Sequence, residues 1–282
     1  SDLIGPGTRK ETELAMSRTV GGRVLLIVAI VLLNRTGLST GDRIERLVVD
    51  GVITVNNLTL LGKTGEIELN NNITAGDTVT VSTIGTGGNI NQAVGTTIDA
   101  INTVDINTTG TNSAIDLAGS TISDTSSVTV TTTNTNSGIT VEATGTVDAA
   151  TDATLTTAND DSDITVDGTI NTTTGNILVS TAGTNSDITL NTTSVVNAGD
   201  TATVETTGAS SNITQLDGST VTAANAVLVD TQADDSTIEI AGDVTSTNTT
   251  VDVKTTGLNS AINIDATGTI LANTDATVST TA

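Results

Sequence analysis

The sequence is defined first by the residues that it does not contain. Its 282 residues include no aromatic residue, no histidine and no cysteine, and only one proline. Without histidine and cysteine the chain has neither the usual general base nor a thiol nucleophile. Without aromatic rings it has no platform on which a sugar or a nucleic-acid base would stack. We therefore expect a protein that is not an enzyme and that does not bind nucleic acid.

Basic residues are scarce and lie almost entirely at the start of the chain. Seven of the nine occur within the first 46 residues, a segment with a net charge near +2. Beyond residue 46 there are 27 acidic residues against Lys63 and Lys254, which gives a net charge near −25. Such a surface repels nucleic-acid phosphates. The opposite signs would favour contact between the start of one copy and the body of another, within a Debye length of about 8 Å.

The remaining residues are mostly Thr, Asn, Asp, Ser, Gly, Ala, Val and Ile, which favour strands over helices. Disorder is an alternative, because low aromatic content with high net charge is typical of unfolded chains. Regular spacing argues against it, since Ile and Val recur in three columns with a step of about 24 residues. The first column is Ile67, Ile90, Ile115, Ile139, Ile164, Ile188, Ile213, Ile238 and Ile262; the second is Ile73, Ile98, Ile122, Val147, Ile170, Val195, Val221, Val244 and Ile270; the third is Val81, Ile106, Val130, Leu155, Val179, Val204, Val229, Val253 and Val278.

Each repeat has three short segments in which apolar residues alternate with polar ones, such as Ile188 and Leu190. This alternation is typical of a strand with one buried face. Three strands and three corners make one coil, and coils stack at a strand spacing of about 4.7 Å. The sequence therefore predicts an all-β fold, a three-sided parallel β-helix (β-solenoid) of about nine coils of 24–25 residues over 50–282. We expect it to be right-handed, as parallel crossovers are.

Serine marks one corner in seven of the repeats, two residues before the first column, and the residue before it is usually Asn or Asp. Such short polar side chains bond to their own backbone and tolerate the left-handed conformation of a sharp bend. We interpret these columns as turn chemistry, and a ligand-binding stripe is the alternative. The residues are Ser113, Ser137, Ser162, Ser186, Ser211, Ser236 and Ser260, preceded by Asn112, Asn136, Asp161, Asn185, Ser210, Asp235 and Asn259.

Calcium is the one cofactor that the sequence suggests. Asp160, Asp161 and Asp163 lie together at one corner, and Asp234 and Asp235 recur at the same corner three coils later. Hard cations bind where several oxygen ligands converge. A solvated acidic corner without a metal is the other interpretation, and the chain then has no cofactor.

Two stretches, GEIELNNNITAGDTVTV (65–81) and SDITLNTTSVVNAGDTATVETTG (186–208), give the chain a resemblance to known exported proteins. They resemble the haemagglutinin-type repeats of two-partner-secreted exoproteins and the passenger shafts of autotransporter adhesins. The resemblance covers about residues 50–282. It implies a right-handed parallel β-helix that is exported to the cell surface.

Residues 1–49 form a separate segment, both basic and apolar. Its ten-residue apolar run is too short for a membrane span of roughly 20 residues. We expect this run either to cap the solenoid or to dock into the next subunit, and a signal peptide that starts at Met16 is a third reading. The run is Val24, Leu25, Leu26, Ile27, Val28, Ala29, Ile30, Val31, Leu32 and Leu33.

The expected function is structural. The sequence ends at Ala282 after a third strand, without a recognisable capping unit, and uncapped strand edges recruit other chains. We expect a non-catalytic subunit of an extracellular or cell-surface filament that stacks head-to-tail with copies of itself. The alternatives are the stalk of a secreted adhesin, with a host or neighbouring cell surface as its partner, and an ice-binding solenoid.

Overall fold

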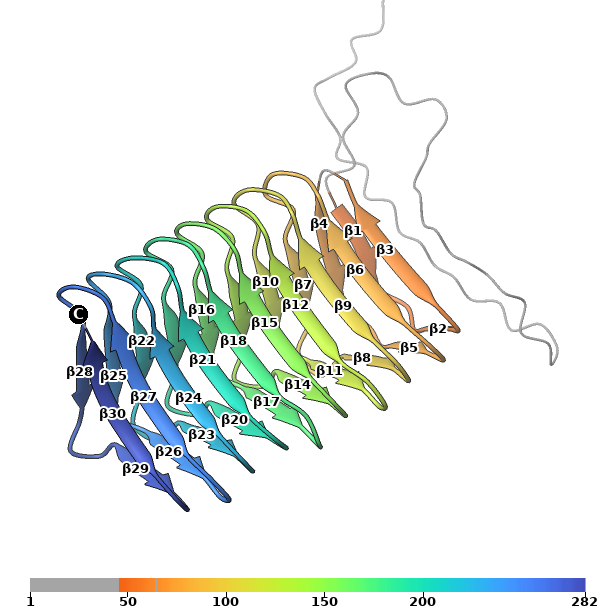
Figure 1. Ribbon diagram of the computed structural model, residues 1–282. Coiled ribbons are helices and arrows are strands. Elements are labelled where there is room, and N and C mark those ends of the chain that lie inside the picture. Colours follow the sequence, from red (N-terminus) through yellow and green to blue (C-terminus); the bar gives the residue numbers. More distant parts are fainter. Residues whose placement is uncertain (1–45, 64, 282) are drawn as a thin grey trace, which may run out of the picture.

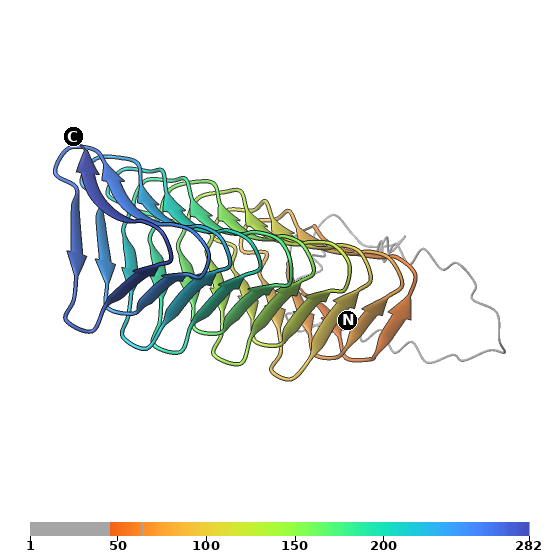
Figure 2. The same cartoon turned by 60° about the horizontal axis from the view of Figure 1, so that its bottom comes forward.

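The computed structural model describes residues 46–63 and 65–281, and these form a three-sided β-solenoid. Figure 1 shows an elongated stack of strands, and Figure 2, which looks more nearly along the stack, shows successive coils lying one behind the other. Three sheets of ten strands run along it, and every strand pair is parallel. The predicted fold class is confirmed.

Each coil gives one strand to each sheet. The first sheet has β1 (Arg46–Val49), β4 (Glu66–Leu69), β7 (Ile90–Gln92), β10 (Ile115–Leu117), β13 (Ile139–Val141), β16 (Ile164–Val166), β19 (Ile188–Leu190), β22 (Ile213–Gln215), β25 (Thr237–Ile240) and β28 (Ala261–Ile264). The second has β2 (Ile53–Val55), β5 (Ile73–Ala75), β8 (Thr97–Ala100), β11 (Ser120–Ser123), β14 (Thr146–Ala149), β17 (Thr169–Thr172), β20 (Val195–Ala198), β23 (Thr220–Ala223), β26 (Asp243–Ser246) and β29 (Thr269–Ala272). The third has β3 (Leu58–Gly62), β6 (Val79–Thr83), β9 (Val104–Thr108), β12 (Val128–Thr132), β15 (Ala153–Thr157), β18 (Ile177–Thr181), β21 (Ala202–Thr206), β24 (Val227–Thr231), β27 (Val251–Thr256) and β30 (Ala276–Thr281).

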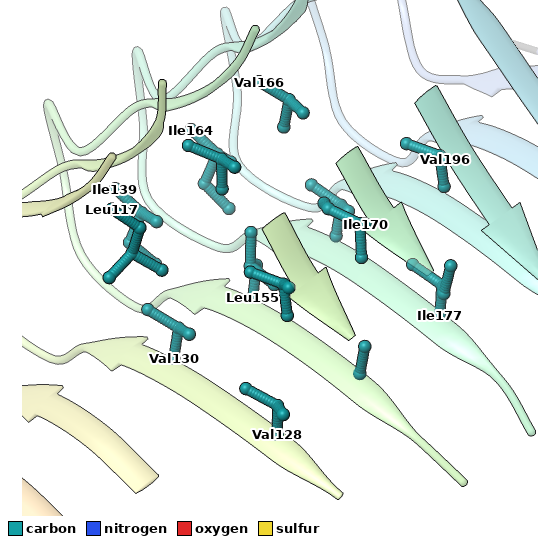
Figure 3. Close-up of a cluster of buried hydrophobic side chains, with 14 of the residues drawn as sticks. Leu117, Val128, Val130, Ile139, Leu155, Ile164, Val166, Ile170, Ile177 and Val196 are labelled. Carbon is teal, nitrogen blue, oxygen red and sulfur yellow. The ribbon is translucent and has the colours of Figure 1, made fainter. Parts of the chain in front are cut away.

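The core is a set of stacked aliphatic columns. Strands alternate buried and partly exposed residues, so each presents one face to the interior. The first and third predicted columns are confirmed, since Ile115 pairs with Ile139 and Val130 with Leu155 in the sheets. Figure 3 shows such side chains pointing into the interior from all three sheets. Burial of aliphatic surface, at about 25 cal/mol per Å², stabilises this core.

The predicted second column is wrong at two positions. Thr121 and Val196, not Ile122 and Val195, pair in line with the inward residues of the second sheet. The reason is that the corner between the first and second sheets varies in length, for example two residues at Ala118–Gly119 and four at 142–145. The first-column residue and the first inward residue after the corner are therefore six residues apart, as Ile115 and Thr121 are, or eight apart, as Ile139 and Val147 are. An odd step of seven, which the sequence prediction assumed at both positions, would place the side chain on the outer face.

A further coil precedes the nine that carry the first Ile column. It consists of β1–β3, and β1 pairs with β4 in register from Arg46 with Glu66 to Val49 with Leu69. Strand β1 therefore lies before the predicted domain boundary at residue 50. Ten coils at about 4.7 Å give a stack roughly 42 Å long between the first and last strands.

Candidate functional site

The most regular chemical feature is a line of buried hydroxyl groups at the third corner, where a strand of the third sheet leads into the next coil. Side chains of the corner serines from Ser113 to Ser236 are fully buried. The N–H of each donates to the hydroxyl of the serine one coil further on, at 3.0 to 3.3 Å. From Ser113 to Ser211 the hydroxyl in turn donates to a carbonyl of the preceding coil, as Ser186 does to Asn159 at 3.2 Å.

A parallel column of inward threonines completes this line, and the sequence analysis missed it. The hydroxyls of Thr132, Thr157, Thr181 and Thr206 each donate to the carbonyl of the corner serine five residues later. We call the two columns together the hydroxyl seam. Buried polar groups are tolerated when they are hydrogen-bonded. The seam therefore joins consecutive coils through their interior without contacting solvent.

The corner itself has the predicted left-handed conformation. The residue before each corner serine, from Asn112 to Asn259, has a positive φ of 53° to 60°, and this includes Ser210. Neighbouring Asx side chains also bond along the stack, as Asn136 Nδ2 does to Asn112 Oδ1 at 2.6 Å and Asn259 Nδ2 to Asp235 Oδ1 at 3.0 Å. The geometry therefore supports the interpretation as turn chemistry.

The calcium candidates are engaged in the same kind of bond. The carboxylates of Asp160, Asp163 and Asp234 each accept a backbone N–H from the next coil at 2.8 Å, and Asp161 and Asp235 accept from Asn side chains. The two clusters are three coils apart, roughly 14 Å. Over residues 46–63 and 65–281 no group of three or more acidic side chains is placed to hold a metal. Calcium binding stays a hypothesis, which melting with and without chelator would test.

The apolar run Val24–Leu33 lies outside the described residues, so its role stays a prediction. Within the described part of the chain, no helix is long and apolar enough to cross a membrane.

The outward threonines of the third sheet form only a small array. Thr129 and Thr131 lie beside Thr154 and Thr156 of the next coil. Asp105 occupies the same outward column before this group, and Leu178 occupies it afterwards. The regular threonine array on which the ice-binding alternative depends is therefore confined to two adjacent coils of this sheet.

One shallow groove lies over the corner between the first and second sheets. The two-residue corner Ala118–Gly119 lies between the four-residue corners 93–96 and 142–145 of the neighbouring coils. Val94 lines the groove on one side and Ala143 and Thr144 line it on the other. Asp116, Glu142 and Asn91 supply its polar groups. We call this feature the corner groove.

A second charged group lies on the outer face of the third sheet. Lys254 Nζ lies 3.7 Å from Asp230 and 3.8 Å from Asp252. Burial raises the pKa of Asp230, and the nearby Lys254 opposes that shift. The side chain of Asp230 also accepts from Gln232 at 3.1 Å. In this cluster the ammonium group of Lys254 partly neutralises two carboxylates.

Comparison of the chain with protein-family models, with curated proteins and with solved structures finds no match. The stacked parallel coils themselves establish the β-solenoid. This architecture alone does not assign the chain to the haemagglutinin-type repeats.

Proposed function

We propose that the chain is the structural shaft of an extracellular or cell-surface filament and has no catalytic role. The observation that carries this proposal is the uninterrupted axial register of the three sheets from β1 to β30. Every coil repeats the same backbone pairing, and the hydroxyl seam joins the coils internally. A continuous ladder of this kind resists bending and local opening, as a load-bearing or spacing element must.

Chemistry along the shaft supports a passive role. Among the described residues, the corner groove has carboxylates and an amide but no base–nucleophile pair, and the only lysines are Lys63 and Lys254. Enzymes place a nucleophile, a base and stabilising donors around one reacting atom. The described shaft shows no such constellation.

Axial stacking supports the filament form of the proposal. In the coil β28–β30, the inward residues Ile264 and Val278 are 40% and 48% exposed, although their partners Ile240 and Val253 on the preceding coil are buried. In the filament form of the proposal, coils of separate copies pair through the same strand edges and apolar columns that neighbouring coils use within one copy.

Electron microscopy of the purified chain tests this function. Ordered filaments with an axial repeat of about 47 Å, which is ten coils at the strand spacing, or more if the first 45 residues add length, support it. Deletion of residues 24–33 should abolish filaments and leave the β signal in circular dichroism unchanged. Filaments that persist after this deletion would reject the assembly role of the apolar run.

The second candidate is the stalk of a haemagglutinin-like adhesin with a host or neighbouring cell surface as partner. The same rigid register supports it, because a stalk also needs length and stiffness. Isolated rods of constant length in the micrographs, at every protein concentration, would favour the stalk over the filament.

A further inference from the structure

We propose that the corner groove binds the basic N-terminal segment of the same chain, with Arg35 as the side chain that enters it. The contact would join the basic N-terminal segment to the acidic shaft, and it does not depend on filament formation. It is carried by the shape of the groove, its chemistry, an ion pair already present nearby and the reach of the chain.

The groove is built into the fold by corner length. Its floor is the short corner Ala118–Gly119, and a methyl group at Gly119 would collide with the backbone oxygen of Thr96 in the preceding coil. The hydroxyl of Thr144 donates to the carbonyl of Ala118 at 2.8 Å, which ties one wall to the floor. Because the walls are two coils apart, the groove is roughly 9–10 Å across, enough for one side chain.

The lining combines apolar and acidic groups. Val94, which is 69% exposed, faces the groove together with Ala118 and Ala143. The carboxylates of Asp116 and Glu142 lie in the same groove, and none of the described residues that line it is basic. An arginine fits this combination, because its aliphatic stem packs on apolar surface while its guanidinium binds carboxylates.

An ion pair shows that this outer face already takes a basic residue from the start of the chain. Arg46, the first described residue, pairs with Glu68 on the next coil. Glu68 is followed along the same outward column by Asn91 and then by Asp116 of the corner groove. Asn91 also donates to Glu66. The column therefore connects the beginning of the shaft to the groove through acidic and amide side chains.

Chain length favours binding within one molecule. The groove is centred on the fourth coil, roughly 14 Å along the stack from the first. Arg35 is 11 residues before Arg46, and 11 extended residues span up to about 36 Å. A tethered segment is present at a high effective concentration, so it outcompetes the same segment of another copy. Docking would hold the apolar run 24–33 beside the shaft, and high salt would release it.

Tryptic cleavage after Arg35 in the full-length chain tests the proposal. At low salt we expect this cleavage to be at least several-fold slower in the native chain than in the double variant Asp116→Asn/Glu142→Gln. High salt should remove the difference. The control Asp105→Asn/Glu205→Gln makes the same change of charge on the outer face of the third sheet and should keep the native protection. Circular dichroism melts check that all variants are folded.

Two results would overturn the proposal. Equal cleavage rates for the native chain and the groove variant, with both folded, would show that the groove does not hold Arg35. Protection that grows with protein concentration would assign the bound segment to another copy. Cleavage after Arg43, which is only three residues before Arg46 in the sequence, provides an internal reference within each digest. The filament test uses the deletion of residues 24–33, whereas the cleavage test uses the full-length chain. The two tests can therefore fail separately.

Discussion

Individual buried hydroxyls have a structural role that their surface counterparts lack. Replacing Ser186 by Ala removes the acceptor of the Ser162 N–H, at 3.0 Å, and the donor to the Asn159 carbonyl. Because both groups are buried, we expect a loss of about 1–3 kcal/mol in the free energy of unfolding. Denaturant unfolding followed by circular dichroism measures it. The matched control is Ser180→Ala on the outer face, and equal losses for the two variants would contradict the hydroxyl seam as a stabilising feature.

The direction in which a side chain points decides how much a charged substitution there lowers the stability of the fold. Ile188 is fully buried, whereas Thr189, the next residue of the same strand, points outward. We expect Ile188→Asp to cost several kcal/mol or to unfold neighbouring coils, because a buried carboxylate has no partner there. Thr189→Asp should change the melting temperature little. Similar melting temperatures for the two variants would argue against the predicted inward column.

At the scale of elements, corners vary while strands keep their register. The two-residue corners at 118–119, 167–168 and 241–242 each contain a glycine over which a methyl group would meet backbone of the preceding coil. We expect Gly119→Ala to destabilise the fold by about 1–3 kcal/mol through this overpacking. Gly51→Ala has open space around it and should be close to neutral. Thermal melts of both variants give the comparison, and a neutral Gly119→Ala would show that the corner can relax.

The same variation explains how far the sequence predicted the fold. The Ile column of the first sheet and the Val column of the third were predictable, because each occupies a fixed place in its strand. Ile122 and Val195 were placed wrongly because corner length changes by two residues without a sequence marker strong enough to detect. The threonine column escaped notice because Thr132 points inward while Thr131 beside it points outward, so residue type alone does not separate them.

Candidate sites were less predictable than the core. The Asx and Ser corners followed from the known conformational preferences of these residues. The corner groove could not be predicted in this way, because it arises where a short corner lies between two long ones on three stacked coils. Its carboxylates, Asp116 and Glu142, are separated by about one repeat and carry no local motif.

At the scale of the whole molecule, acidity should make stability depend on pH. Burial raises the pKa of Asp99, Asp105, Asp116, Asp163 and Asp230 above the ordinary 3.8, and neighbouring acidic groups add to the shift at Asp99, Asp163 and Asp230. These carboxyls bind protons more readily in the folded state than in the unfolded state. The folded state therefore gains stability as the pH falls from neutral through the raised pKa values, and the gain is complete below about 3.8.

The melting temperature should accordingly be higher near pH 4 than near pH 7. Melts across this range, at constant ionic strength, measure the effect. The variant Asp116→Asn should show a smaller gain than the native chain. A melting temperature that falls steadily on acidification would contradict the expected contribution of these carboxyls.

The central claim is that coils stack along one axis, within a copy and across copies, to make a filament. X-ray diffraction from oriented filaments of the purified chain tests it most directly. Strands that cross the axis at the usual spacing predict a strong meridional reflection near 4.7 Å, with an axial subunit repeat of about 47 Å or slightly more. Filaments whose 4.7 Å reflection lies off the meridian, or a chain that forms no filaments under any condition, would contradict the account.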